Sequence, residues 1–288
     1  MAPRPPDAPR ASRLPLVLAL ALLTVVCAMA ARQASVAIDG TRYYYLDDDQ
    51  MISMRYARNL AEGRGLVWNA GERVEGYTNF GWVLVMAAVH AMGTPPRLAS
   101  LAVEAVNWAL ACAVVILTDR LLRRFVQDPP MLLRGAVLVT MALSVDLLFW
   151  AVNGFETTLL TAVFVLALVR VVDDAARGTF TAGTCLIAGL LPLIRSDAAD
   201  LTGIVLLAGV GLGLRRRWWL AALAAAPLAA HEAFRLQYYG DWLPNTYYLK
   251  VAGRSGLAYL GLGYAKGFVA AYPVAIVLAG AALFMSRD

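Results

Sequence analysis

The stretch of sequence that decides the fold is residues 43–82, which read YYYLDDDQMISMRYARNLAEGRGLVWNAGERVEGYTNFGW. Three carboxylates, Asp47, Asp48 and Asp49, stand side by side in it, soon after the three tyrosines Tyr43–Tyr45. Tyrosine collects at membrane–water interfaces, whereas ionised carboxylates are costly next to lipid. The stretch is therefore typical of a polar loop at a membrane surface, and the adjacent aspartates need an explanation.

The residues after the aspartates have the spacing of a short helix. Gly63 is suited to its C-terminal cap, and the free N–H groups at its N-terminus favour ionised carboxylates. One aspartate is enough to cap the helix, so we interpret the three together as functional. The expected apolar positions are Met51, Ile52, Tyr56 and Leu60. We expect an amphipathic helix that lies in the interface.

The composition of the whole chain indicates a membrane environment. Its 288 residues are 60% hydrophobic and 16% charged, with a mean hydropathy of +0.62. Soluble domains are less apolar and more charged than this. The net charge of +5 comes mainly from arginines near the ends of apolar runs, which is usual for cytoplasmic loops and gives no reason to expect nucleic-acid binding. We therefore expect an all-α polytopic membrane protein.

The apolar runs predict about eight transmembrane helices within residues 14–288, after a cytoplasmic tail of residues 1–13. The first run has two interpretations, a signal peptide or a signal-anchor helix, and the many later spans favour the anchor. The predicted spans are Leu14–Ala31, Leu98–Thr118, Gly135–Val152, Thr158–Val172, Phe180–Ile194, Ala198–Leu214, Trp218–Phe234 and Gly267–Met285.

The short apolar segment Phe80–Gly93 decides the topology. If it does not cross the membrane, most Lys and Arg side chains outside the first loop fall on the cytoplasmic side; if it crosses, the two sides are nearly even. The positive-inside rule favours the first arrangement. Residues 32–97 then form an outer catalytic loop, and the connections NGFET, IRSD and QYYGDWLPNTYYLK lie on the same outer side. Both termini are then cytoplasmic.

Four segments resemble bacterial GT-C glycosyltransferases, in the order found in that family. They are LDDDQMISMRYARNLAEGRGLVWNAGERVEGYTNF, NGFETTLLTA, LIRSDAA and YYGDWLPNTYYLK. The first is long and specific, and the other three are short. Within the family, the chain is similar to the mycobacterial terminal arabinofuranosyltransferases and to relatives assigned to flagellar motor control. The resemblance covers most of the chain from Tyr43 to about Lys250 and implies a GT-C-like helix bundle.

This resemblance implies an inverting enzyme that uses a polyprenyl-phosphate-linked sugar, hexose or pentose, at the outer face of the bacterial cytoplasmic membrane. The implied acceptor is a glycan, lipid or protein of the cell envelope. Family members usually carry two acidic residues here; matching DDQMIS makes Asp48 the leading one, Asp49 the second and Asp47 an extra. Members usually continue through more spans, so we expect a fragment, a split version or a reduced homologue.

Glycosyl transfer needs a base for the acceptor hydroxyl and a cation near the departing phosphate. Asp48 is the expected base, with Asp49 beside it. Glu156 matches an acidic residue that in the family orients substrate or assists the base; a charge in the first turn of a helix is the alternative. Arg195 and Lys250 are the expected phosphate-binding cations, although cations at an interface also occur without a function.

The polar segment GERVEGYTNF is expected to shape the acceptor site through Glu75, Tyr77 and Asn79. A phosphate-activated donor does not require a cofactor, and a divalent metal held by Asp47–Asp49 stays open. A non-enzymatic alternative also stays open: a transporter, flippase or assembly factor on a GT-C-like body. Transporters often contain internal repeats, and the first-loop pattern does not recur in the second half of the sequence.

Overall fold

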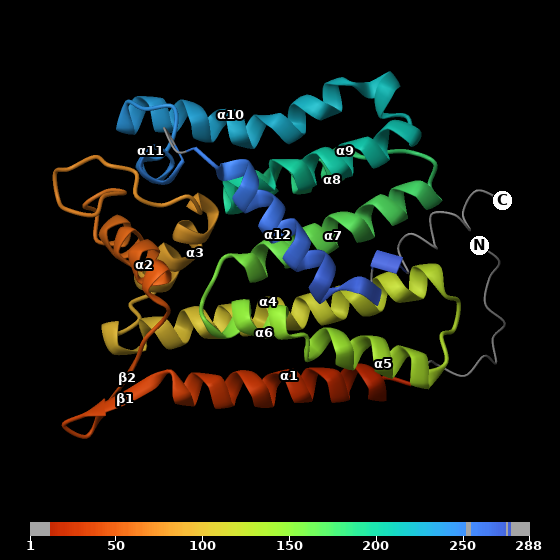
Figure 1. Cartoon of the computed structure of the whole chain (residues 1–288), viewed down its shortest axis with the longest axis horizontal. Helices are drawn as coiled ribbons and strands as arrows, with labels where there is room; N and C mark the ends of the chain where they lie inside the picture. The colour runs from red at the N-terminus through yellow and green to blue at the C-terminus, as the bar shows by residue number, and fades with distance from the viewer. Residues whose placement is uncertain (1–11, 252–254, 275, 278–288) are drawn as a thin grey trace. The chain divides into compact units, whose positions relative to one another are not determined.

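The computed structural model describes residues 12–251, 255–274 and 276–277, and it is largely helical (Figure 1). It divides into two compact units, Met1–Trp242 and Leu243–Asp288, which are treated separately. The first unit contains α1 (Leu14–Gln33), α2 (Asp48–Ala61), α3 (Phe80–Ala91), α4 (Pro96–Phe125), α5 (Met131–Ala142), α6 (Val145–Val152), α7 (Thr157–Ala176), α8 (Ala182–Ile194), α9 (Ala199–Gly211) and α10 (Trp219–Tyr239), with 3-10 turns η1 (Ser196–Ala198) and η2 (Leu214–Arg217). The second contains α11 (Asn245–Lys250) and α12 (Leu257–Ala271).

The helices have the lengths and composition of a membrane protein. Among the described residues, α1 and α4 are long and apolar enough to cross a bilayer. The pair α5 and α6 adds a third candidate if its 42° bend lies within one span. Ser144 lies at this break in the predicted span Gly135–Val152, and its hydroxyl caps α6 by accepting a 3.2 Å hydrogen bond from the N–H of Leu147. The expectation of an all-α membrane protein is confirmed at this level.

Several of the other predicted spans are shorter or more polar than expected. α8 and α9 have 13 residues each, so each is about 20 Å long, less than the roughly 30 Å of a hydrocarbon core. α7 and α10 are longer, but carry charged side chains near their C-terminal ends, among them Asp173 and Arg235. Of the predicted tail 1–13 the structure describes residues 12–13, and of the predicted span Gly267–Met285 it describes residues 267–274 and 276–277.

A β-hairpin, which the sequence analysis did not predict, follows α1. β1 (Ser35–Ile38) pairs antiparallel with β2 (Thr41–Tyr44), and Ser35 lies opposite Tyr44. The two turn residues, Asp39 and Gly40, have φ angles of 47° and 75°. Asp-Gly is among the strongest signals for such a two-residue turn, so the hairpin could have been found from the sequence.

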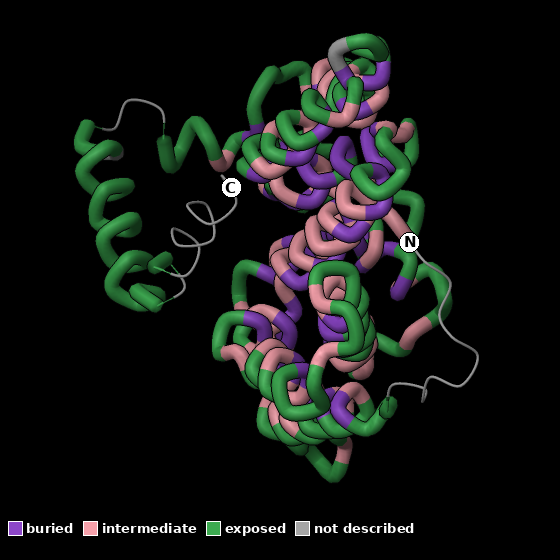
Figure 2. The backbone as a smooth tube through the Cα atoms, turned by 90° about the vertical axis from the view of Figure 1, so that its right-hand side faces the viewer, coloured by how far each residue is buried: buried purple, intermediate pink, exposed green. Residues whose placement is uncertain are grey.

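The helices α2 and α3 lie together at one end of the bundle (Figure 1). Their shared core contains Tyr56 and Ala57 of α2 and Trp82, Val83 and Met86 of α3, all nearly fully buried. Figure 2 shows that buried positions of the first unit lie where its helices face one another. With 12 residues α3 is about 18 Å long, too short for a straight crossing. That Phe80–Gly93 does not cross, and which side this end faces, stay predictions.

The opposite end of the bundle is held by buried ion pairs. Arg134 makes two hydrogen bonds to the carboxylate of Asp119, at 2.6 and 2.9 Å, and both residues are almost fully buried. Asp173 pairs with Arg120 at 3.1 Å and with Arg124 at 2.7 Å. These arginines belong to the predicted cytoplasmic loops, so on that side charge also fixes the ends of α4, α5 and α7.

Candidate active site

The three aspartates begin α2. Asp47 is the N-cap residue, with φ −56° and ψ 152°, and its side chain makes no capping hydrogen bond. Asp48 and Asp49 occupy the first turn and are exposed. Oδ1 of Asp48 accepts a 2.8 Å hydrogen bond from the backbone N–H of Asp49. The helix therefore starts where the sequence predicted, and its first turn presents two carboxylates to solvent.

The neighbouring Asp48 affects the titration of Asp47. A hydrogen bond between these side chains raises the pKa of Asp47 above its ordinary value, and partial desolvation and the nearby negative charges act in the same direction. The Asp47 carboxyl therefore binds its proton more tightly than an isolated aspartate does.

The apolar face of α2 agrees with the prediction at three of four positions, because Tyr56 is buried and Ile52 and Leu60 pack against the same core. Met51 was expected on the apolar face, yet its side chain is 42% exposed. The buried positions also include Gln50, Ser53, Met54 and Ala57, because α2 packs against α3 through this side. The end of the helix agrees with the prediction, since Gly63 follows the last turn with a φ of 75°.

Glu156 is the centre of a buried polar cluster at this end of the bundle. It lies at the N-terminus of α7 and is 6% exposed. Its Oε2 atom accepts hydrogen bonds from Nδ2 of Asn79, at 3.0 Å, and from Nε2 of Gln50, at 3.5 Å. Its Oε1 atom accepts a 2.9 Å hydrogen bond from the guanidinium of Arg195. One carboxylate thus joins α2, the start of α3, the start of α7 and the end of α8.

Arg195 leaves α8 at its C-cap in an extended conformation, with φ −147° and ψ 127°. Besides Glu156, it binds the carboxylate of Asp197 through two hydrogen bonds, at 3.0 and 2.8 Å. The hydrogen bonds with Asp197 raise the pKa of Arg195, and the same pairing lowers the pKa of Asp197. The Arg195 side chain is 35% exposed and that of Asp197 67%, so this edge of the cluster is open to solvent.

Sequence reasoning missed two members of the cluster, Gln50 and Ser53. Ser53 Oγ donates a 3.0 Å hydrogen bond to Oδ1 of Asn79, and both α2 residues are almost fully buried. They stand three residues apart and therefore on one face of the helix. Two polar residues on the face that also carries Met54 and Ala57 are the signal that could have revealed a buried polar contact.

A second buried cluster attaches the first loop to α10. Nε of Arg235 donates a 2.7 Å hydrogen bond to Glu75, and its NH1 atom binds Glu232 at 2.5 Å. Glu75 and Arg235 are 4% and 6% exposed. Burial raises the pKa of Glu75, while Arg235 acts in the opposite direction. The sequence marked Glu75 as an acceptor contact, and the structure gives it a protein partner 160 residues away.

Tyr77 strengthens the same attachment. Its hydroxyl lies 3.1 Å from that of Tyr239 on α10, which donates a 2.7 Å hydrogen bond to the carbonyl oxygen of Leu66. Tyr77 is 3% exposed, and burial raises its pKa. Glu75, Tyr77 and Asn79 are thus all buried with protein partners, and their contact with an acceptor stays a prediction.

The remaining predicted residue, Lys250, ends α11 in the second unit and is exposed. Its part in a site with Arg195 stays a prediction. Among the residues that the structure describes, no three His, Cys, Asp or Glu side chains are grouped so as to hold a metal ion.

Two curated proteins are similar to the chain, and both are named terminal β-(1→2)-arabinofuranosyltransferase. The one from Mycobacterium tuberculosis is 29% identical over 221 residues, which cover 70% of this chain and 34% of that protein. The one from Corynebacterium glutamicum is 31% identical over 273 residues, which cover 83% of this chain and 38% of that protein. The chain thus spans little more than a third of either relative.

The chain matches no family model and no solved structure. The resemblance that the four sequence segments indicated, to proteins of the terminal arabinofuranosyltransferase type, is confirmed by the two curated relatives over most of the chain.

Proposed function

We propose, from the similarity to two arabinofuranosyltransferases, that this chain carries the catalytic end of a membrane glycosyltransferase. One observation supports this above all. The exposed carboxylates of Asp48 and Asp49 begin a helix whose next buried residues bind a cluster formed by Asn79, Glu156 and Arg195. Each of these residues belongs to a segment that resembles the family, and the chain folds them into one end of the bundle.

The proposed reaction moves a sugar from a polyprenyl-phosphate donor to a hydroxyl of a cell-envelope glycan, lipid or protein, at the extracytoplasmic face. Asp48 takes the proton of the acceptor hydroxyl while that oxygen bonds to the anomeric carbon. The bond from the anomeric carbon to the phosphate oxygen breaks, and the electron pair leaves with the polyprenyl phosphate. Attack opposite the leaving group inverts the anomeric configuration.

Asp48 is the better base because it is exposed, whereas the oxygens of Glu156 are already occupied. Asp49 lies next to it in the same turn and is proposed to hold the acceptor. In this proposal Glu156 is a positioning residue. By binding Gln50, two residues after Asp48, it sets the orientation of the first turn of α2.

Arg195 is proposed to stabilise the departing phosphate. Its guanidinium is partly exposed and holds the more exposed Asp197 on its open side. A phosphate would compete with Asp197 for the same N–H groups, since guanidinium binds both anions through paired hydrogen bonds. Lys250, the last residue of α11 in the second unit, is proposed as a second cation.

Glu75, Tyr77 and Asn79 are proposed to shape the acceptor site through the backbone that they fix. Glu75 and Tyr77 fasten residues 75–77 to α10. Asn79 is the N-cap residue of α3, and its side chain binds Glu156 rather than the helix backbone. The loop between α2 and α3 is thereby fixed to α10 and to the start of α7.

A transfer assay tests the proposal. The chain is purified into phosphatidylglycerol–phosphatidylethanolamine vesicles and given polyprenyl-phosphate arabinofuranose or a polyprenyl-phosphate hexose, with arabinan or mannan oligosaccharides as acceptors. The expected result is transfer of the pentose with inversion, lost in Asp48→Asn. Donor binding with no transfer to any acceptor would instead favour the non-enzymatic alternative, and absence of both would reject the proposed donor class.

A further inference from the structure

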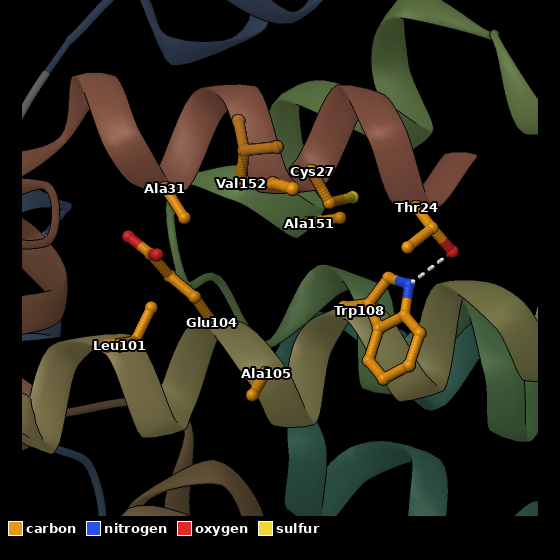
Figure 3. A pocket seen from close by; sticks show the side chains of 10 residues that line it. Thr24, Cys27, Ala31, Leu101, Glu104, Ala105, Trp108, Ala151 and Val152 are labelled. Atoms are coloured by element: carbon orange, nitrogen blue, oxygen red, sulfur yellow. Dashed lines mark hydrogen bonds between the residues drawn. The ribbon is translucent and has the colours of Figure 1, made fainter. Parts of the chain in front are cut away.

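A cavity that the proposed reaction does not use lies between α1, α4 and α6. It has a volume of about 220 Å³. Its walls are mainly apolar, and the side chains that matter here are Thr24, Cys27, Ala31, Glu104, Trp108 and Ala151 (Figure 3). The indole N–H of Trp108 donates a 3.1 Å hydrogen bond to Thr24, which links α4 to α1 at one end of the cavity.

Glu104 brings a carboxylate into this apolar space. The residue is 7% exposed, and neither of its carboxylate oxygens has a hydrogen-bond partner among the described residues. Figure 3 shows its side chain pointing from α4 toward α1, near Ala31. An ionised carboxylate buried without a partner is strongly unfavourable, so a ligand that supplies a donor or a positive charge would be stabilised at this position.

The cavity opens on the side of the bundle. Thr24, Ala28, Ala105 and Trp108 are exposed and form its rim. Since α1 and α4 are the two helices that qualify individually as membrane spans among the described residues, this rim would face lipid rather than water when both helices cross the bilayer. Ala31 lies in the last turn of α1. The part of the cavity that Ala31 lines is therefore near the end of the span, where lipid headgroups begin.

We propose that this cavity binds the primary ammonium headgroup of a membrane phospholipid, with Glu104 as its counter-ion. A phosphate is the wrong ligand, because two anions would repel each other in an apolar site, so the cavity is distinct from the proposed donor site. A hydroxyl would supply one donor without charge, whereas a primary ammonium supplies three donors and the charge that Glu104 lacks. The volume suits a headgroup but not a whole lipid.

The end of α1 offers a group for the lipid's own phosphate. Arg32 directly follows Ala31 and is exposed. A zwitterionic headgroup would therefore place its ammonium in the cavity and its phosphate near the surface. The acyl chains would lie along the lipid-facing sides of α1 and α4.

Native mass spectrometry of the full chain tests the proposal with phosphatidylethanolamine, phosphatidylcholine and phosphatidylglycerol as probes. Phosphatidylcholine carries a positive charge but no N–H donor, and phosphatidylglycerol carries hydroxyl donors but no cation. The wild type should retain phosphatidylethanolamine most strongly. Glu104→Gln should bind it at least about tenfold more weakly, since a charged partner of a hydrogen bond is lost. Ala28→Leu, which narrows the rim, should also weaken the binding of phosphatidylethanolamine. Glu72→Gln, in the loop between α2 and α3, should leave this binding unchanged.

A stability measurement separates this role from a merely structural one. In detergent without phosphatidylethanolamine, Glu104→Gln should melt at the same or a higher temperature than the wild type, because an unpaired buried charge is removed. Added phosphatidylethanolamine should raise the melting temperature of the wild type but not of Glu104→Gln. Dodecylamine should displace the lipid. Equal retention of the three phospholipids by the wild type, or an unchanged preference in Glu104→Gln, would overturn the proposal.

Discussion

The side-chain amide of Asn79 donates a 3.0 Å hydrogen bond to the carboxylate of Glu156, across 77 residues of sequence. Asn79 is the N-cap residue of α3 and Glu156 that of α7. Their bond therefore joins the polar first loop to the start of a bundle helix, beneath the exposed aspartates of α2. The proposed chemistry depends on this junction, because it sets where the first turn of α2 lies.

Removal of the proposed base should abolish transfer without unfolding the protein. Asp48→Asn is expected to lower the rate by about a hundred- to ten-thousand-fold, the usual loss for a general base. Its melting temperature should stay near that of the wild type, because the side chain is exposed. The measurement is transfer from a polyprenyl-phosphate sugar, with Asp47→Asn as the matched control. Full activity in Asp48→Asn would remove the aspartate from the mechanism, and a large drop in melting temperature would make its role structural.

The cation prediction concerns the departing phosphate. Arg195→Ala and Lys250→Ala should each slow transfer from the polyprenyl-phosphate donor, because negative charge that builds on the phosphate loses a partner. Arg195→Lys should recover part of the rate, since it restores the charge without the paired N–H groups. Donor titrations of kcat and KM measure the effect. Wild-type turnover in both alanine variants would show that neither side chain matters to the phosphate.

Glu156 should be needed for stability as well as for activity. Glu156→Ala leaves Asn79 without its buried acceptor and takes one partner from Arg195, so the free energy of unfolding should fall by about 2 kcal/mol. Thermal melts in detergent measure this loss, with Glu72→Gln as an exposed control. A double variant with Asn79→Ala should lose less than the sum of the two single losses, because both remove the same bond. If the losses of the two single variants simply add in the double variant, the hydrogen bond between Asn79 and Glu156 does not stabilise the fold.

The pairing of Asp197 with Arg195 should make stability depend on pH in the acid range. The folded-state pKa of Asp197 lies below its ordinary value of 3.8, so its contribution is present above that pH and is lost as pH falls through the lowered value. The melting temperature of the wild type should exceed that of Asp197→Asn at neutral pH, and the gap should close in acid. Asp200→Asn, whose side chain bonds the backbone N–H of Leu201, is the control. A difference in melting temperature that grows in acid would contradict a stabilising pair between Asp197 and Arg195.

The predicted topology can be tested by thiol labelling in a variant without the native Cys27, Cys112 and Cys185. Ser196 and Arg216 are exposed and suit cysteine substitution. Gly154 does not, because its φ is 79° and a Cβ there would lie 2.8 Å from Leu46. A membrane-impermeant reagent applied to intact cells should label Ser196→Cys but not Arg216→Cys. The reverse pattern would invert the topology.

The sequence by itself determined much of the local structure. Apolar composition indicated membrane helices, and the row Asp47–Asp49 followed by helical spacing located the start of α2. The four family-like segments pointed to the glycosyltransferase resemblance that the curated relatives confirm. These signals are local, because composition, capping and short motifs depend on residues close together in the chain.

Only the tertiary structure decided which polar residues meet. From the sequence, no role was predicted for Gln50, Ser53 or Arg235. Each is buried against a partner far away in sequence. A polar side chain can be buried only where another element supplies its hydrogen bonds. Spacing along one helix gives its faces but not the neighbour that each face will contact, so the clusters around Glu156 and Glu75, and the unpartnered Glu104, emerge only when the helices pack.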